Sequence, residues 1–146
     1  MPDIKTLGFG GPDGTFLTSH RVSQADFEAK ATSLQPTDLP YEAGRSSASD
    51  PSQFNLYAID QAGRLQRPVE IIANLDVRNR PWYRQAAQTL KPGWTEPFQV
   101  GRTSLLTLNA YTPFLDGQGQ LQGVFFVNIS LDQLNQFLDQ IAVGKI

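Results

Sequence analysis

Three strand–turn–strand segments constrain the fold of this chain more than any other feature. Each places an aspartate and a glycine between two aliphatic or aromatic runs: residues 5–22 with Pro12-Asp13-Gly14 at the turn, residues 55–66, and residues 112–124. Proline fixes φ and glycine accepts φ > 0, so this composition favours a tight turn between neighbouring strands. The segments therefore predict hairpins of an antiparallel sheet, and they do not form a repeat protein.

The last hairpin also indicates how the two faces of the sheet differ. One parity of its strands is almost entirely apolar and contains Leu106, Leu108, Ala110, Thr112, Phe114, Leu121, Gly123, Phe125, Val127 and Ile129. The other parity mixes aromatic residues with Asn109, Tyr111 and Asn128. The period of two predicts antiparallel strands whose apolar face is covered by helices. The mixed face is suited to a ligand pocket over the sheet.

Three segments have helical character, and one segment has the composition of a long loop. Ser130 and Gln133 have capping-box spacing at the start of an apolar helical pattern that continues to residue 141. A second helix is predicted over residues 80–90 and a third over residues 23–34. Residues 35–53 are rich in Pro, Ser and Asp, which predicts a surface loop that serves as a lid or is disordered.

The helix at residues 80–90 begins in an unusual segment, DVRNRPWYRQA, with three arginines within seven positions. Pro81 suits a first helical turn. A cation such as Arg80 at that end is unfavourable by about 0.3–1 kcal/mol, so a partner is expected. The residues leave two partners open: Asp76 in a salt bridge, or an anionic ligand such as a carboxylate held by two parallel hydrogen bonds. Trp82 and Tyr83 suit either core positions or pocket walls.

Composition and charge exclude several classes of function. A length of 146 residues and 40% hydrophobic residues indicate one globular domain over residues 1–146. The net charge of −2, without a basic stripe, argues against nucleic-acid binding. The chain has no cysteine and one histidine, His20, which predicts no metal site and no cofactor. His20 has no acid beside it in the sequence and is expected to be an ordinary surface or core residue, and no catalytic motif supports an enzyme.

The sequence shows no membrane segment of its own. The longest apolar run near the C-terminus, residues 124–127, is far shorter than the roughly 20 residues that span a bilayer. No signal-peptide pattern opens the chain. If the domain is exported or tethered, its membrane segments are expected to lie outside these residues.

The order of these elements resembles a Cache domain, a PAS-like extracellular sensor module of bacterial chemoreceptors, histidine kinases and cyclases. The resemblance covers roughly residues 4–141 and is strongest over residues 80–86 and 123–131. It implies an α+β fold with a twisted antiparallel sheet of about five strands and helices across it. It also implies the membrane-distal module of a double Cache type, in a membrane-anchored parent with room for a kinase or cyclase output domain.

In Cache domains that bind amino acids, an Arg-x-Trp-Tyr signature holds the ligand carboxylate and acidic residues hold its amine. Arg80, Trp82 and Tyr83 match the first part of this pattern. The second part is missing, because the expected tyrosines and aspartates fall on Leu75, Phe98, Val100 and Asn128. A buried ammonium needs such an acceptor, so the resemblance predicts a ligand with an acid group and a neutral or apolar remainder.

These observations predict an extracytoplasmic (periplasmic) ligand-sensing module. The expected ligand-binding residues are Arg80, Trp82, Tyr83, Phe98, Asn109, Tyr111 and Asn128. The C-terminal helix would carry a shift to the next module, and a homodimer is compatible with the fold. The alternative is a dimerisation or spacer module of the same fold with a filled pocket, in which Arg80 pairs with Asp76. A cytosolic PAS-like cofactor domain is disfavoured by the lack of a cysteine or a haem histidine.

Overall fold

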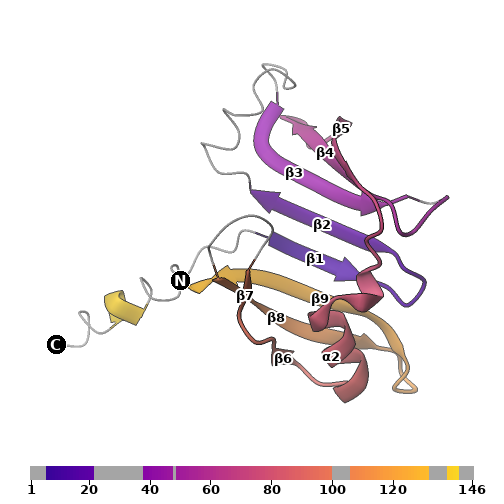
Figure 1. Ribbon diagram of the computed structural model, residues 1–146, viewed down its shortest axis with the longest axis vertical. Coiled ribbons are helices and arrows are strands. Elements are labelled where there is room, and N and C mark those ends of the chain that lie inside the picture. Colours follow the sequence, from indigo (N-terminus) through magenta and orange to yellow (C-terminus); the bar gives the residue numbers. More distant parts are fainter. Residues whose placement is uncertain (1–5, 22–37, 48, 100–105, 132–137, 142–146) are drawn as a thin grey trace.

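A computed structural model describes residues 6–21, 38–47, 49–99, 106–131 and 138–141. In these ranges the chain forms one antiparallel sheet of nine strands with the order β5-β4-β3-β2-β1-β9-β8-β6, and β7 also pairs with β8 (Figure 1). The strands are β1 (Thr6–Gly10), β2 (Phe16–Arg21), β3 (Asp38–Ser46), β4 (Phe54–Asp60), β5 (Leu65–Ile72), β6 (Gly93–Trp94), β7 (Phe98–Gln99), β8 (Leu106–Leu115) and β9 (Leu121–Ser130). The helices are the 3-10 helix η1 (Val77–Asn79) and the α-helix α2 (Pro81–Thr89).

All three predicted hairpins are confirmed as the antiparallel pairs β1–β2, β4–β5 and β8–β9. The second and third turns are stabilised by the same pattern of hydrogen bonds from backbone N–H groups to an aspartate side chain. Asp60 accepts hydrogen bonds from the backbone N–H groups two and four residues later, and Asp116 does the same in the last hairpin. Gly63 and Gly119 then adopt φ values of 77° and 78°, which residues with a side chain rarely adopt.

The predicted loop over residues 35–53 is wrong in its central part, which forms strand β3. This strand pairs with β2 on one side and β4 on the other, and that pairing satisfies its backbone despite a composition poor in strand formers. The register shifts between Asp38 and Glu42, and such an irregularity accommodates a proline within a strand. Together with β6 and β7, this strand explains why the described sheet has nine strands and not about five.

Helix α2 confirms the helix predicted over residues 80–90, with Pro81 in its first turn and Leu90 as a left-handed C-cap at φ 54°. The helix predicted over 23–34 lies outside the described residues. The C-terminal helix is described only at residues 131 and 138–141, which are helical. In the part of the chain that the structure describes, no helix is long and apolar enough to cross a membrane.

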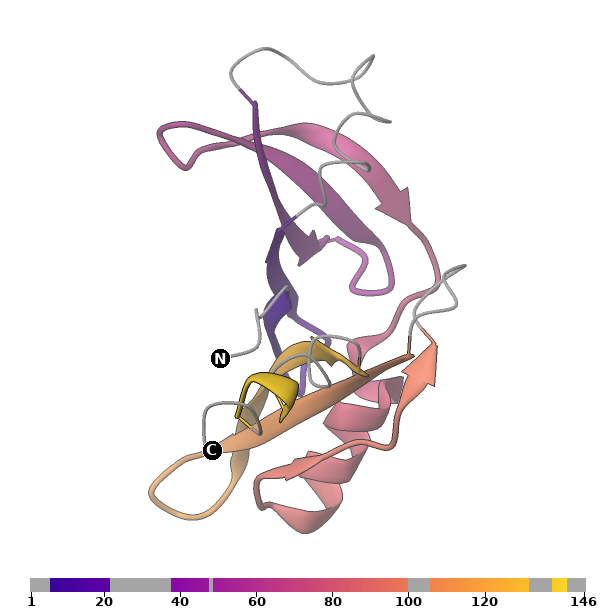
Figure 2. The same cartoon turned by 90° about the vertical axis from the view of Figure 1, so that its left-hand side faces the viewer.

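The sheet is bent, and α2 lies against the part formed by β8 and β9 (Figure 2). The sequence predicted that helices cover the apolar parity of the sheet. This prediction is wrong for α2, which packs on the opposite, mixed face. The close packing of η1 and α2 on β1 requires a glycine at position 10. A Cβ on Gly10 would lie 2.7 Å from Val77, 3.0 Å from Trp82 and 3.2 Å from Tyr83. Several large side chains of the apolar parity and its neighbouring strands stay exposed instead: Leu7, Leu17, Leu106, Phe114 and Phe125.

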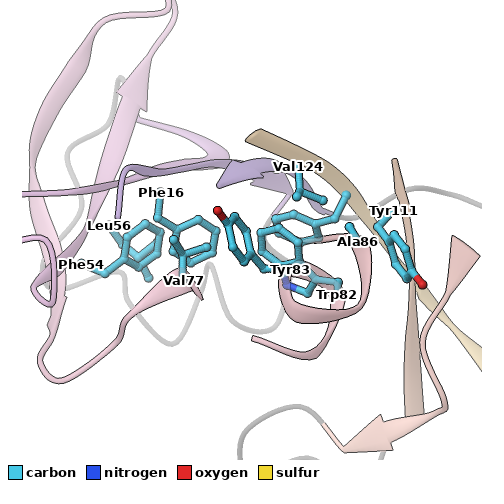
Figure 3. Close-up of a cluster of buried hydrophobic side chains, with 10 residues drawn as sticks. Phe16, Phe54, Leu56, Val77, Trp82, Tyr83, Ala86, Tyr111 and Val124 are labelled. Atoms are coloured by element: carbon cyan, nitrogen blue, oxygen red, sulfur yellow. The ribbon is translucent and has the colours of Figure 1, made fainter. Parts of the chain in front are cut away.

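The core lies between α2 and the mixed face of the sheet. It runs from Phe54 and Leu56 on β4 to Tyr111 on β8, with Trp82 in the middle (Figure 3). The Trp82 ring stacks on Phe126 with centroids 4.1 Å apart at 21°. Burial of these rings supplies the main stabilisation of the fold.

Candidate functional site

A cavity of about 230 Å³ lies on the mixed face of the sheet, beside the N-terminus of α2. Eight of its lining residues are apolar: Phe16, Phe54, Leu56, Ile72, Leu75, Trp82, Phe98 and Phe126. The polar lining residues are Thr6, Thr18, His20, Arg80, Asn109 and Asn128. Among the described residues, the lining thus contains an arginine but no carboxylate.

Arg80 stands at the edge of this cavity as the N-cap residue of α2, and its side chain makes no capping hydrogen bond. The expected alternative partner, Asp76, is occupied by Arg78. Arg78 Nη2 lies 2.8 Å from Asp76 Oδ2, and Arg78 Nε lies 3.0 Å from Asp76 Oδ1. Asp76 caps η1 through the backbone of Arg78, which brings that side chain and not Arg80 to the carboxylate. Within the described ranges, Arg80 has no ion pair.

Asp76→Asn should flatten the dependence of stability on acidic pH. Hydrogen bonds from the Arg78 side chain hold the pKa of Asp76 below its ordinary value of 3.8. This carboxylate therefore adds stability above that value, and the contribution is lost as the pH falls through the lower folded-state pKa. Urea unfolding of wild type and variant at pH 7 and pH 3 measures the change. Arg78→Ala should behave like Asp76→Asn, whereas the same flattening in Arg80→Ala would contradict the pairing.

The cavity brings five of the seven predicted binding residues together: Arg80, Trp82, Phe98, Asn109 and Asn128. Trp82 is both a core residue and a cavity wall, so its two alternative roles coincide. Tyr83 and Tyr111 are buried in the core and do not line the cavity. The Tyr111 hydroxyl donates to Gln85 Oε1 at 3.2 Å and ties β8 to α2, and burial raises the pKa of Tyr83.

A row of polar side chains crosses five neighbouring strands on the cavity face. The pairs His20–Glu42, Thr6–His20, Thr6–Asn128 and Asn109–Asn128 stand directly opposite each other, and we call these five residues the polar row. His20 Nε2 lies 3.2 Å from Glu42 Oε2, and Glu42 is 4% exposed. The sequence suggested a histidine without an acidic neighbour, and the pairing of β2 with β3 supplies one.

The sequence reasoning did not identify the lining residues of the first five strands or Phe126. For Phe16, Thr18 and His20, the signal was present, because they share one parity of β2 and the tight turn at Pro12 fixes the register with β1. No local signal identified Leu75 as a lining residue, although the Cache resemblance marks this position as one where a tyrosine is expected. Val100 lies outside the described residues.

Comparison with known proteins places this geometry in a family. A family model for the first PDC sensor domain of methyl-accepting chemotaxis protein-like proteins matches residues 14–136. The chain belongs to this family, which confirms the resemblance to a Cache-like sensor module. Members of this class are sensor domains and not catalytic ones. No curated protein matches the sequence.

A solved structure described as methyl-accepting chemotaxis protein X is similar at 17% sequence identity and a TM-score of 0.44. The similarity covers 90% of this chain and 40% of the other. The chain thus spans less than half the length of that protein.

Proposed function

We propose that this chain is the extracytoplasmic ligand-sensing domain of a bacterial membrane signalling protein. Its ligand is a small molecule with a carboxylate, which Arg80 holds at the edge of the cavity. The observation that carries this proposal is the position of Arg80: it lines the cavity and has no ion pair among the described residues, because Arg78 occupies Asp76. Family membership supports the sensing role, and it also supports the proposed membrane context.

The character of the lining favours a carboxylate over other ligands. A guanidinium matches a carboxylate through two parallel hydrogen bonds. The backbone N–H groups that follow Pro81 in the first turn of α2 point toward the N-terminal end of the helix, where Arg80 lies. Trp82 and Phe126 provide apolar walls beside it. The described lining offers no carboxylate to an ammonium group, so α-amino acids are poorly matched.

The alternative spacer module is less well supported. It requires a filled pocket and an Arg80–Asp76 pair, whereas the cavity measures about 230 Å³ and Asp76 pairs with Arg78. A homodimer remains compatible with either function. The sensing function and the spacer function predict different effects of Arg80→Ala on the melting temperature of the protein without ligand.

Arg80→Ala should abolish the stabilisation of the protein by small carboxylic acids. An acid present at 100 times its Kd stabilises by about 2.7 kcal/mol, and each kcal/mol raises Tm by roughly 2–4 °C in a domain of this size. Thermal unfolding with a panel of acids, amino acids, amines and sugars measures this. Arg84→Ala is the matched control, because Arg84 is exposed on the same helix and does not line the cavity.

The same variant without ligand separates binding from structure. Because Arg80 is a cation at a helix N-terminus, Arg80→Ala should leave Tm unchanged or raise it slightly, by the equivalent of about 0.3–1 kcal/mol. If no acid shifts the wild type and Arg80→Ala melts at a clearly lower temperature, Arg80 is structural and the spacer function is correct.

A further inference from the structure

His20 on β2 and Glu42 on β3 form a titratable pair at the cavity wall, which we call the His–Glu pair. The two residues stand directly opposite each other in register, and His20 Nε2 lies 3.2 Å from Glu42 Oε2. His20 lines the same cavity as Arg80, whereas Glu42 does not line it and is 4% exposed. The histidine is therefore the member of the pair that a ligand in the cavity would contact.

The side chains that flank the His–Glu pair in the described strands are uncharged, and the charged groups nearest to it in the fold are arginines. Thr6 on β1 and Ala58 on β4 stand opposite the two members of the pair. Arg21 follows the histidine in β2, Arg67 lies on β5 beyond β4, and Arg80 lines the cavity. A guanidinium keeps its charge at any ordinary pH, so these three residues do not titrate with the pair.

Two further carboxylates have the parity of the cavity face, Asp60 on β4 and Glu70 on β5. A hydrogen bond from the backbone N–H of Arg64 holds the pKa of Asp60 below its ordinary value of 3.8, so Asp60 stays ionised at neutral pH. Glu70 is exposed, and solvent screens its charge from the cavity. Histidine ordinarily changes its charge between about pH 5 and pH 8. Over this range the His–Glu pair gains one proton, while the neighbouring arginines and Asp60 keep their charges.

We propose that the His–Glu pair is part of the ligand site and that the domain binds its carboxylate ligand together with a proton. Protonation of the pair adds one unit of positive charge at the cavity wall, which strengthens the binding of an anion. The bound anion favours the protonated pair in return, because such a coupling is reciprocal. This proposal rests on the proposed function, in which Arg80 holds the carboxylate in the same cavity. A sensor with this site responds most strongly where an organic acid and protons occur together.

The size of the cavity sets the expected strength of this coupling. A volume of about 230 Å³ is that of a sphere roughly 8 Å across, and over such a distance at an effective dielectric constant of about 20 one unit of charge changes an affinity by roughly tenfold or more. A carboxylate should therefore bind about tenfold more tightly at pH 5.5 than at pH 8. An uncharged ligand should bind with equal affinity at both pH values.

Calorimetric titration of the 146-residue chain with lactate, 2-hydroxybutanoate and mandelate at pH 5.5 and pH 8 tests the proposal. These acids stay ionised over the whole range, and lactamide is the uncharged comparison. Titration at pH 7 in buffers of different ionisation enthalpy counts the protons that are taken up on binding, and uptake of a fraction of one proton is expected. His20 is the only histidine of the chain, so the imidazole signal in the proton NMR spectrum belongs to it. Lactate at pH 7 should move this signal toward its position in the protonated form.

Variants of the His–Glu pair separate its charge from its structural role. The double variant His20→Gln with Glu42→Gln replaces the pair by two neutral amides and should bind lactate equally at both pH values. Glu42→Gln alone should bind lactate about tenfold more tightly than wild type at pH 8, because a negative charge beside the cavity is lost. A merely structural role of this residue would not increase the affinity. Glu70→Gln is the matched control and should change the affinity by less than about twofold, since Glu70 is exposed and does not line the cavity.

The possible outcomes distinguish this proposal from the proposed function. Arg80-dependent binding of the acids that is equally tight at both pH values would overturn the proton-linked site and uphold the proposed function. Tighter binding at pH 8, or a pH dependence that persists in the double variant, would also overturn it. Absence of any binding would overturn both.

Discussion

Trp82→Ala is expected to lower the free energy of unfolding by about 3–5 kcal/mol, the range for removing a buried large aromatic side chain. Trp82 is 1% exposed and stacks on Phe126, and its ring also contacts Tyr83 edge-on. Its removal leaves a void between α2 and the sheet that neither element can close. Urea unfolding at neutral pH, followed by circular dichroism, measures the loss.

Trp94→Ala is the matched control for this experiment. Trp94 belongs to the two-residue strand β6 and is 62% exposed, so its loss should change stability by no more than about 0.5 kcal/mol. A similar loss from both variants would show that Trp82 is not the centre of the core. Trp82→Phe keeps an aromatic ring against Phe126 and should fold, which allows its ligand binding to be compared with that of Arg80→Ala.

Gly8→Val should destabilise the protein by about 3 kcal/mol, at the upper end of the usual cost of overpacking. A Cβ on Gly8 would lie 2.2 Å from the Phe126 ring and 2.9 Å from the carbonyl oxygen of Leu17. The carbonyl belongs to the paired backbone of β2, and the ring is held by Trp82. Neither neighbour can move without breaking a strand pair or a ring stack.

The matched control for Gly8→Val is Gly117→Ala in the last hairpin turn. A Cβ at Gly117 would meet no atom within 4 Å, so the expected change is small. Chemical denaturation of both variants measures the difference. If Gly8→Val were as stable as wild type, the close approach of Phe126 to β1 would be wrong, and with it the shape of the cavity wall.

Local sequence accounted for the hairpins and for α2 because their determinants lie within a few residues. Asp60 and Asp116 bind the backbone of their own turns, and Gly63 and Gly119 provide the positive φ that those turns require. Pro81 sets the first turn of α2 in the same local way. Such contacts need no knowledge of the rest of the chain.

Strand β3 could not be predicted in this way. Its nine residues include a proline, a glycine and three charged residues, which local propensity assigns to a loop. The strand exists because its backbone pairs with β2 on one side and β4 on the other. Neither pairing is made within a single short turn, so local propensity does not reveal it. The His20–Glu42 contact follows from the pairing of β2 with β3, so the sequence alone did not predict it.

The sequence by itself determined the class of the domain, the turns, the parity of β8 and β9, and Arg80 at the start of α2. The tertiary structure decided which face α2 covers and which polar residues form one row across the sheet. The physical reason is range. Turn and cap contacts are made within one short segment, whereas the cavity is closed by strands whose pairing joins distant parts of the chain.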